Sequence, residues 1–72
     1  MPRDSELPST RVFAALKDKI ESGELQPGEQ MPSLRKISED YGISQTTARK
    51  VIEALASEGL VEIKPRWGSF VR

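Results

Sequence analysis

The sequence predicts a mainly α-helical domain with a small β-hairpin: a winged helix-turn-helix of three helices plus a two-stranded wing. One observation is a short helical segment that stops at Gly42 and is followed almost at once by Ser44, a residue suited to begin the next helix. The other is the loss of helical periodicity after Gly59, where short apolar runs flank a tight loop. A hairpin that follows such a helical unit is the wing of a winged helix.

The 72 residues are enough for one small domain. We expect residues 1–8, which carry two prolines and mixed charge, to form a flexible arm and residues 9–72 to form the domain. The first helix is expected at about residues 10–22, with Ser9 or Thr10 as its N-cap. Its apolar positions recur at helical spacing: Val12, Phe13, Leu16 and Ile20.

Two further helices complete the helical part. After a Pro-Gly turn and a very short extended stretch toward Pro32, Ser33 caps the second helix, which Gly42 ends. The side chains expected on its buried face are Leu34, Ile37 and Tyr41. Ser44 caps the third helix, which runs to about Glu58. The glycines that end the three helices are Gly23, Gly42 and Gly59.

The wing is expected to consist of two strands, at residues 60–63 and 69–72, joined by a tight loop at residues 65–68. Arg66 stands at the tip, where an arginine can enter a narrow minor groove. We expect Trp67 to cover the small core, because an exposed tryptophan is unfavourable unless something covers it. The alternative is contact with the sugar-phosphate edge of a duplex.

Composition excludes several classes of function. The chain has no cysteine and no histidine, which removes thiolate zinc sites, disulfides and the commonest general base. We therefore expect no enzyme, no metal site and no cofactor. The apolar runs are too short to span a bilayer and the N-terminus lacks a signal-peptide core, so we expect a cytoplasmic protein with no membrane partner.

The third helix has one apolar face and one polar face. A helical wheel gathers its apolar positions on one arc: Ala48, Val51, Ile52 and Leu55. The opposite arc holds Thr46, Arg49, Lys50 and Glu53, with Gln45 and Thr47 at its edges. Since phosphates repel the carboxylate of Glu53, a DNA-reading surface should occupy only the N-terminal half of the helix.

Donor geometry suggests a role for each polar side chain in that half. Arg49 can pair with guanine O6 and N7, and Gln45 with adenine N6 and N7. Thr46 and Thr47 offer hydroxyls for phosphate and methyl groups for thymine. Lys50 is a point charge suited to phosphate. The alternative is an ordinary solvated helix face.

Ser33 and Arg35 at the start of the second helix add contacts where that helix would cross the DNA backbone. The alternative for Arg35 is an ion pair with Glu39, four residues on. The net charge is zero, which suits a protein-interaction module better than a DNA binder. However, cations cluster locally after residue 30, at Arg35-Lys36, Arg49-Lys50 and Lys64 with Arg66, so one face can still be positive.

Five linked motifs in register resemble the DNA-binding domain of the GntR family of bacterial transcription regulators. They are Gly23-Glu-Leu-Gln-Pro-Gly28, Met31-Pro-Ser-Leu-Arg35, Tyr41-Gly-Ile-Ser44 with Thr46-Thr-Ala-Arg49, Leu55-Ala-Ser-Glu-Gly-Leu-Val61 and Gly68-Ser-Phe-Val71. The resemblance covers residues 20–71, and the combination is specific where each motif alone would be weak.

The resemblance implies a winged helix that binds an inverted-repeat operator in double-stranded DNA, as a homodimer in the full-length protein. It also implies a C-terminal domain for a small-molecule effector; that domain is absent from this chain, which we expect to be the DNA-binding half of a longer regulator, a repressor. The DNA-contacting roles of the family fall here on Arg35, Ser44, Gln45, Thr46, Thr47, Arg49 and Gly68.

Three positions depart from the family pattern. Arginine is common where this chain has Gln45, and valine where it has Ala48. The first departure implies a different base preference or the loss of a phosphate contact. Glycine is usual at the wing tip where this chain has Arg66, so a side chain replaces bare backbone at the point expected to enter the minor groove.

Overall fold

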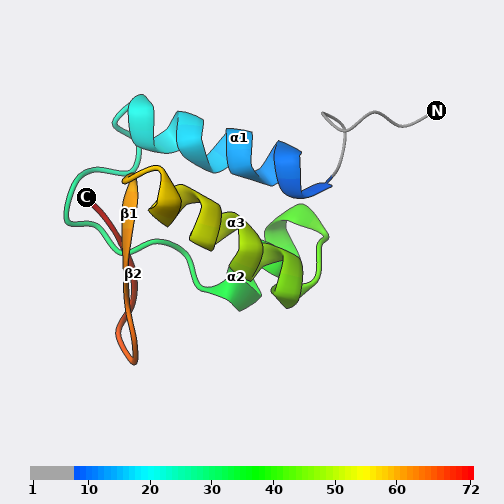
Figure 1. Ribbon diagram of the computed structural model, residues 1–72. Helices are drawn as coiled ribbons and strands as arrows, with labels where there is room; N and C mark the ends of the chain where they lie inside the picture. Colours follow the sequence, from blue (N-terminus) through cyan, green and yellow to red (C-terminus); the bar gives the residue numbers. More distant parts are fainter. Residues whose placement is uncertain (1–7) are drawn as a thin grey trace.

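The computed structural model describes residues 8–72 and has the winged-helix architecture predicted from the sequence. Its elements are α1 (Pro8–Glu21), α2 (Leu34–Tyr41), α3 (Gln45–Ser57), β1 (Val61–Lys64) and β2 (Gly68–Val71). Helix α3 packs against both α1 and α2, and the β1–β2 hairpin projects past α3 on the side away from α1 (Figure 1).

Helix α1 begins at Pro8, earlier than the predicted start at residue 10, and ends at Glu21. Proline is well tolerated in the first turn of a helix, because its missing N–H would have no partner there. The assignment of residue 8 to the arm was therefore wrong, and the rest of the arm lies outside the described residues. Gly23 ends the helix with φ +88°, as expected.

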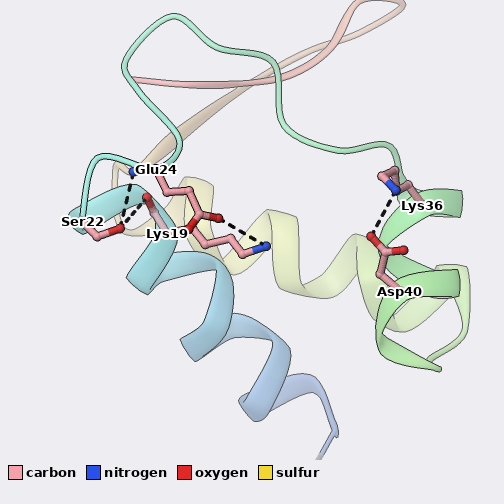
Figure 2. A network of polar contacts seen from close by, with 5 residues as sticks. All are labelled: Lys19, Ser22, Glu24, Lys36 and Asp40. Atoms are coloured by element: carbon pink, nitrogen blue, oxygen red, sulfur yellow. Dashed lines mark hydrogen bonds and ion pairs between the residues drawn. The ribbon is translucent and has the colours of Figure 1, made fainter.

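A small polar network closes the C-terminal end of α1 (Figure 2). The Ser22 hydroxyl donates to the Lys19 carbonyl at 3.3 Å and accepts from the Glu24 N–H at 3.4 Å. The Lys19 ammonium also lies 3.7 Å from the Glu24 carboxylate. These contacts fix the direction in which the chain leaves α1.

Both predicted serine N-caps are confirmed. The hydroxyls of Ser33 and Ser44 accept hydrogen bonds from the N–H groups of Lys36 and Thr47, each at 3.1 Å. Gly42 ends α2 in the left-handed region, with φ 67°. Because both ends of the turn are satisfied locally, the start of α3 is held in a defined place beside α2.

The connection from α2 to α3 is tied a second time by Ser38 and Ile43. The Ile43 N–H donates to the Ser38 carbonyl at 3.1 Å, and the Ser38 hydroxyl donates back to the Ile43 carbonyl. A reciprocal pair of bonds across five residues leaves the turn little freedom. The angle between the two helices is therefore set by the turn as well as by packing.

The core draws on all three helices, both strands and the segment before α2. The predicted apolar face of α3 is confirmed, and Tyr41 lies half-buried against the core. The buried side chains are Val12, Leu16, Met31, Ile37, Ala48, Val51, Ile52, Leu55, Val61 and Val71.

The wing is attached to the domain at its base. Strands β1 and β2 are antiparallel, with Val61 opposite Val71 at the buried end and Lys64 opposite Gly68 at the tip. The segment before α2 lies along the other side of β2: the Val71 carbonyl accepts from Gly28 N at 2.8 Å, and Met31 N donates to the Ser69 carbonyl at 2.6 Å. The expected short extended stretch therefore pairs with the wing.

Trp67 does not cover the core, and that expectation was wrong. Its exposed fraction is 72%, which makes it the more exposed of two large apolar side chains at the surface of residues 8–72. The reason is geometric, because Met31, Val61 and Val71 already fill the base of the hairpin. The tip lies beyond the core and cannot fold back onto it.

Candidate nucleic-acid interface

Three exposed polar side chains of the N-terminal half of α3 lie together. Gln45, Thr46 and Arg49 are exposed, and with Leu34 of α2 they line a hollow of about 300 Å³. The wheel prediction for these three residues is confirmed, and the hollow places their functional groups on a common surface. Amide, hydroxyl and guanidinium groups together can read base edges in a major groove.

Ser44 and Thr47 are used differently. The Ser44 hydroxyl donates to the Thr47 hydroxyl at 3.0 Å while it accepts from the Thr47 backbone N–H. Thr47 is also half-buried. Both hydroxyls therefore hold the first turn of α3. The proton of Ser44 is engaged, whereas the Thr47 hydroxyl can still donate its own proton.

A groove of about 380 Å³ separates α3 from the wing. Arg49 and Glu53 line its α3 side, and Lys64, Arg66 and Gly68 line its wing side. The fold thus brings Arg49 and the wing-tip Arg66 to one groove. Glu53 occupies the same α3 wall, one turn beyond Arg49, which agrees with a reading surface limited to the first half of the helix.

Lys50 lies apart from this groove. Together with Phe13 of α1, it lines a separate hollow of about 300 Å³ on the α1 side of α3. One step along a helix turns the side chain by about 100°. The structure therefore separates Lys50 from Arg49, although both belong to the polar arc of the wheel.

At the start of α2, Ser33 is an exposed N-cap and Arg35 points into solvent with 79% of its side chain exposed. The ion pair considered as the alternative for Arg35 does form, at 3.3 Å from Glu39. An exposed pair at this spacing contributes only about 0.2–0.5 kcal/mol. A phosphate could therefore replace the carboxylate at little cost.

Four ion pairs within residues 8–72 engage four of the cations and leave others without a carboxylate partner. They join Lys17 to Glu58, Lys19 to Glu24, Arg35 to Glu39 and Lys36 to Asp40, and Figure 2 shows the second and the fourth. Within that part of the chain, Arg49, Lys50 and Arg66 take part in no ion pair. Their charges remain available to a ligand on α3 and the wing.

The wing tip is a type II turn. Trp67 N–H donates to the Lys64 carbonyl at 3.0 Å, Pro65 stands at the second position, and Arg66 at the third has φ +76°. The fixed negative φ of proline excludes the mirror-image turn. Arg66 therefore occupies a position that normally requires glycine, and this strain fixes where its side chain leaves the tip.

No pattern in the sequence indicated that Gln30 belongs to this site. Its side-chain amide donates to the Trp67 carbonyl at 2.8 Å, and its Nε2 lies 2.7 Å from the place of a Cβ on Gly68. A contact between residues 37 positions apart leaves no local pattern in the sequence. Among the described residues, no group of three His, Cys, Asp or Glu side chains is placed to hold a metal ion.

Comparison with known proteins decides the family. The model of bacterial regulatory proteins of the gntR family matches residues 8–71. The chain belongs to the GntR family. Within residues 8–72, no helix combines the length and the apolar character needed to cross a membrane.

Relatives of this GntR-family chain are transcription regulators. The transcriptional repressor NagR of Bacillus subtilis (strain 168) is 39% identical over 61 residues, which are 85% of this chain and 25% of NagR. The Uxu operon regulator of Haemophilus influenzae is 39% identical over 62 residues, 86% of this chain and 23% of that protein. The chain thus spans about a quarter of the length of these relatives.

Solved structures of GntR-type DNA-binding domains share the fold. The DNA-binding domain of AraR in complex with operator ORE1 has a TM-score of 0.90 at 28% identity, covering 99% of this chain and 90% of that chain. The same domain in complex with operator ORX1 has a TM-score of 0.87 at 28% identity, covering 90% of this chain and 78% of that chain. This chain is therefore a GntR-family DNA-binding domain.

Proposed function

We propose that this domain reads an operator in double-stranded DNA, as part of a transcriptional repressor that acts in the cytoplasm and catalyses no reaction. The observation that carries the proposal is the groove between α3 and the wing. Arg49 and Arg66 line it, and neither has a carboxylate partner within the described residues. Unpaired cations beside exposed hydrogen-bonding groups suit phosphates and base edges together.

Within this proposal the N-terminal half of α3 enters the major groove. Arg49 pairs with guanine and Gln45 with adenine, while Thr46 contacts a thymine methyl group or a phosphate. Arg66 and Gly68 approach the adjacent minor groove from the wing.

A second set of residues contacts the DNA backbone. Ser44 and Thr47 contribute mainly by orienting α3, because the Ser44 hydroxyl donates its proton to the Thr47 hydroxyl and accepts from the Thr47 N–H. Ser33, Arg35 and Lys50 lie to the sides of the reading surface. We assign them to phosphates, which flank the groove on both sides.

The full-length regulator would be a homodimer on an inverted repeat, with half-sites about one helical turn, roughly 34 Å, apart. A small-molecule effector would act through a C-terminal domain. The length of the relatives, of which this chain covers about a quarter, supports a further domain in the full-length regulator.

The test is a selection of bound duplexes from a random pool, followed by titration of the best duplex with the domain at about 50 and about 200 mM salt. We expect a defined site and a steep loss of affinity at the higher salt. A pool that returns no preferred sequence would refute operator reading.

The alternative is a winged helix that docks a protein partner and ignores DNA, and the exposure of Trp67 favours it. The same titration tests it. The alternative predicts that the anisotropy of the labelled duplex does not rise as the domain is added, at either salt concentration.

A further inference from the structure

Hydrogen bonds hold the backbone of Trp67, whereas its side chain is largely exposed to solvent. Its N–H donates to the Lys64 carbonyl at 3.0 Å, and its carbonyl accepts from the Gln30 amide at 2.8 Å. Both polar backbone groups are therefore engaged, yet 72% of the residue is exposed. The wing therefore holds the Trp67 backbone in place and exposes an indole that contributes nothing to the core.

The surroundings of the indole are positively charged. The tip of the wing, residues 63–69, holds Lys64 and Arg66 and no carboxylate. Arg66 is adjacent to Trp67 and takes part in no ion pair within residues 8–72. A second copy docking tip to tip would bring like charges together, whereas a polyanion with apolar sugar faces matches both the cations and the ring.

The position of the wing tip indicates which part of a DNA duplex Trp67 can contact. The hairpin extends beyond α3 on the side away from α1, so the tip lies to one side of the α3 reading surface (Figure 1). Trp67 and Arg66 also line a hollow of about 340 Å³ between the wing and Ser33 at the start of α2. An element beside a groove-bound helix meets the sugar-phosphate wall and the neighbouring minor groove.

We propose that Trp67 packs its indole against deoxyribose at the edge of the minor groove that flanks the bases read by α3. In this arrangement Arg66 supplies the ionic part of the wing contact and Trp67 the apolar part. The inference rests on the proposed function, because it requires that the domain bind duplex DNA.

Trp67 is the single tryptophan of the chain, so its fluorescence reports on this contact alone. The unmodified domain is titrated with the best duplex from the selection, and acrylamide quenching of Trp67 is measured in parallel with the anisotropy of labelled duplex. We expect the quenching constant to fall severalfold as the duplex saturates. The control is Ala14→Trp in a Trp67→Phe background, which places the probe on the exposed face of α1; its quenching should not change.

Substitutions test the apolar nature of the contact. Trp67→Ala should weaken binding roughly tenfold, as expected for loss of one aromatic contact to nucleic acid, and Trp67→Phe should retain most of the affinity. Neither variant should alter the slope of affinity against salt, because no charge is removed. Far-ultraviolet circular dichroism and thermal melting of each variant verify that the domain still folds.

The outcomes distinguish failure of the proposed Trp67 contact from failure of the proposed DNA binding. Duplex binding by anisotropy with undiminished quenching of Trp67 would overturn the inference and leave operator reading intact. Protection of Trp67 that rises with protein concentration in the absence of DNA would assign the indole to a second copy and also overturn it. Absence of binding by anisotropy would refute the proposed function itself.

Discussion

The side-chain amide of Gln30 donates a 2.8 Å hydrogen bond to the backbone carbonyl of Trp67, joining the segment before α2 to the tip of the wing. Gln30 also forms a bridge with Phe70 on β2. The wing is therefore more than a hairpin anchored at its base, since a side chain from a distant segment supports its tip. This support determines how firmly the tip can be presented to a duplex.

Replacing Gln30 with alanine should loosen the wing tip. A hydrogen bond of this kind contributes about 0.5–1.5 kcal/mol, so we expect a small loss of stability and faster exchange of the Trp67 amide proton. Hydrogen exchange followed by nuclear magnetic resonance measures the effect. Gln30→Glu is the matched control: it keeps the size but has no donor for the carbonyl, and it should resemble the alanine variant. Unchanged exchange in both would show that the bond does not hold the tip.

Gly68→Ala should destabilise the domain by about 1–3 kcal/mol, measured by urea unfolding. Gly68 has φ +111°, and an added Cβ would lie 2.7 Å from Gln30 Nε2. Gly28→Ala separates the two causes, because Gly28 has φ +90° but no atom within 4 Å of its Cβ position. If the contact matters, the cost at Gly68 exceeds that at Gly28 and shrinks in a Gln30→Ala background. Equal costs would leave only the backbone angle as the cause.

Arg66→Gly should raise stability and weaken DNA binding. A non-glycine residue at φ +76° carries strain of about 1 kcal/mol, which glycine removes. The loss of one phosphate-neutralising cation should also flatten the slope of log affinity against log salt by about 0.9. Urea unfolding and titrations at several salt concentrations measure the two effects. A variant that gains stability with unaltered DNA affinity would remove Arg66 from the interface.

Arg49→Ala should abolish operator selectivity and leave the helical circular-dichroism spectrum unchanged, because Arg49 is exposed on α3. Loss of a bidentate contact to guanine costs about 1–3 kcal/mol of discrimination. Arg49→Lys is the control that keeps the charge without the planar fork, so it should keep non-specific affinity and still lose selectivity. The ratio of affinities for the selected and a scrambled duplex is the measurement, and an unaltered ratio would refute the role of Arg49.

Lys50→Ala should weaken binding evenly across sequences and flatten the salt slope by about one unit, since a point charge on the side of α3 meets phosphate rather than bases. Lys19→Ala is the matched control. Lys19 is paired with Glu24 at the end of α1, so its removal should not change the slope. A loss that depends on the sequence of the duplex would contradict a phosphate role for Lys50.

Much of the fold follows from local patterns in the sequence. The caps Ser33 and Ser44, the stop at Gly42 and the buried face of α3 each depend on residues within about four positions of one another. Interactions over so few residues produce a recognisable spacing in the sequence. The helical periodicity that identified the buried face of α3 also predicted that Gln45, Thr46 and Arg49 lie on its exposed face. The start of α1 was misjudged because proline is favourable inside a first helical turn as well as before it.

Only the tertiary structure decided the arrangement of the wing. The packing of Met31, Val61 and Val71 fills the base of the hairpin and so leaves Trp67 outside, and the backbone bonds along β2 bring Gln30 to the tip. The packing of α1 and of the wing against α3 likewise decided that Lys50 lies beside α1 while Arg49 lines the groove beside the wing. Hydrophobic burial brings together segments that are far apart in the sequence. The contacts of the wing therefore cannot be recognised from patterns among neighbouring residues.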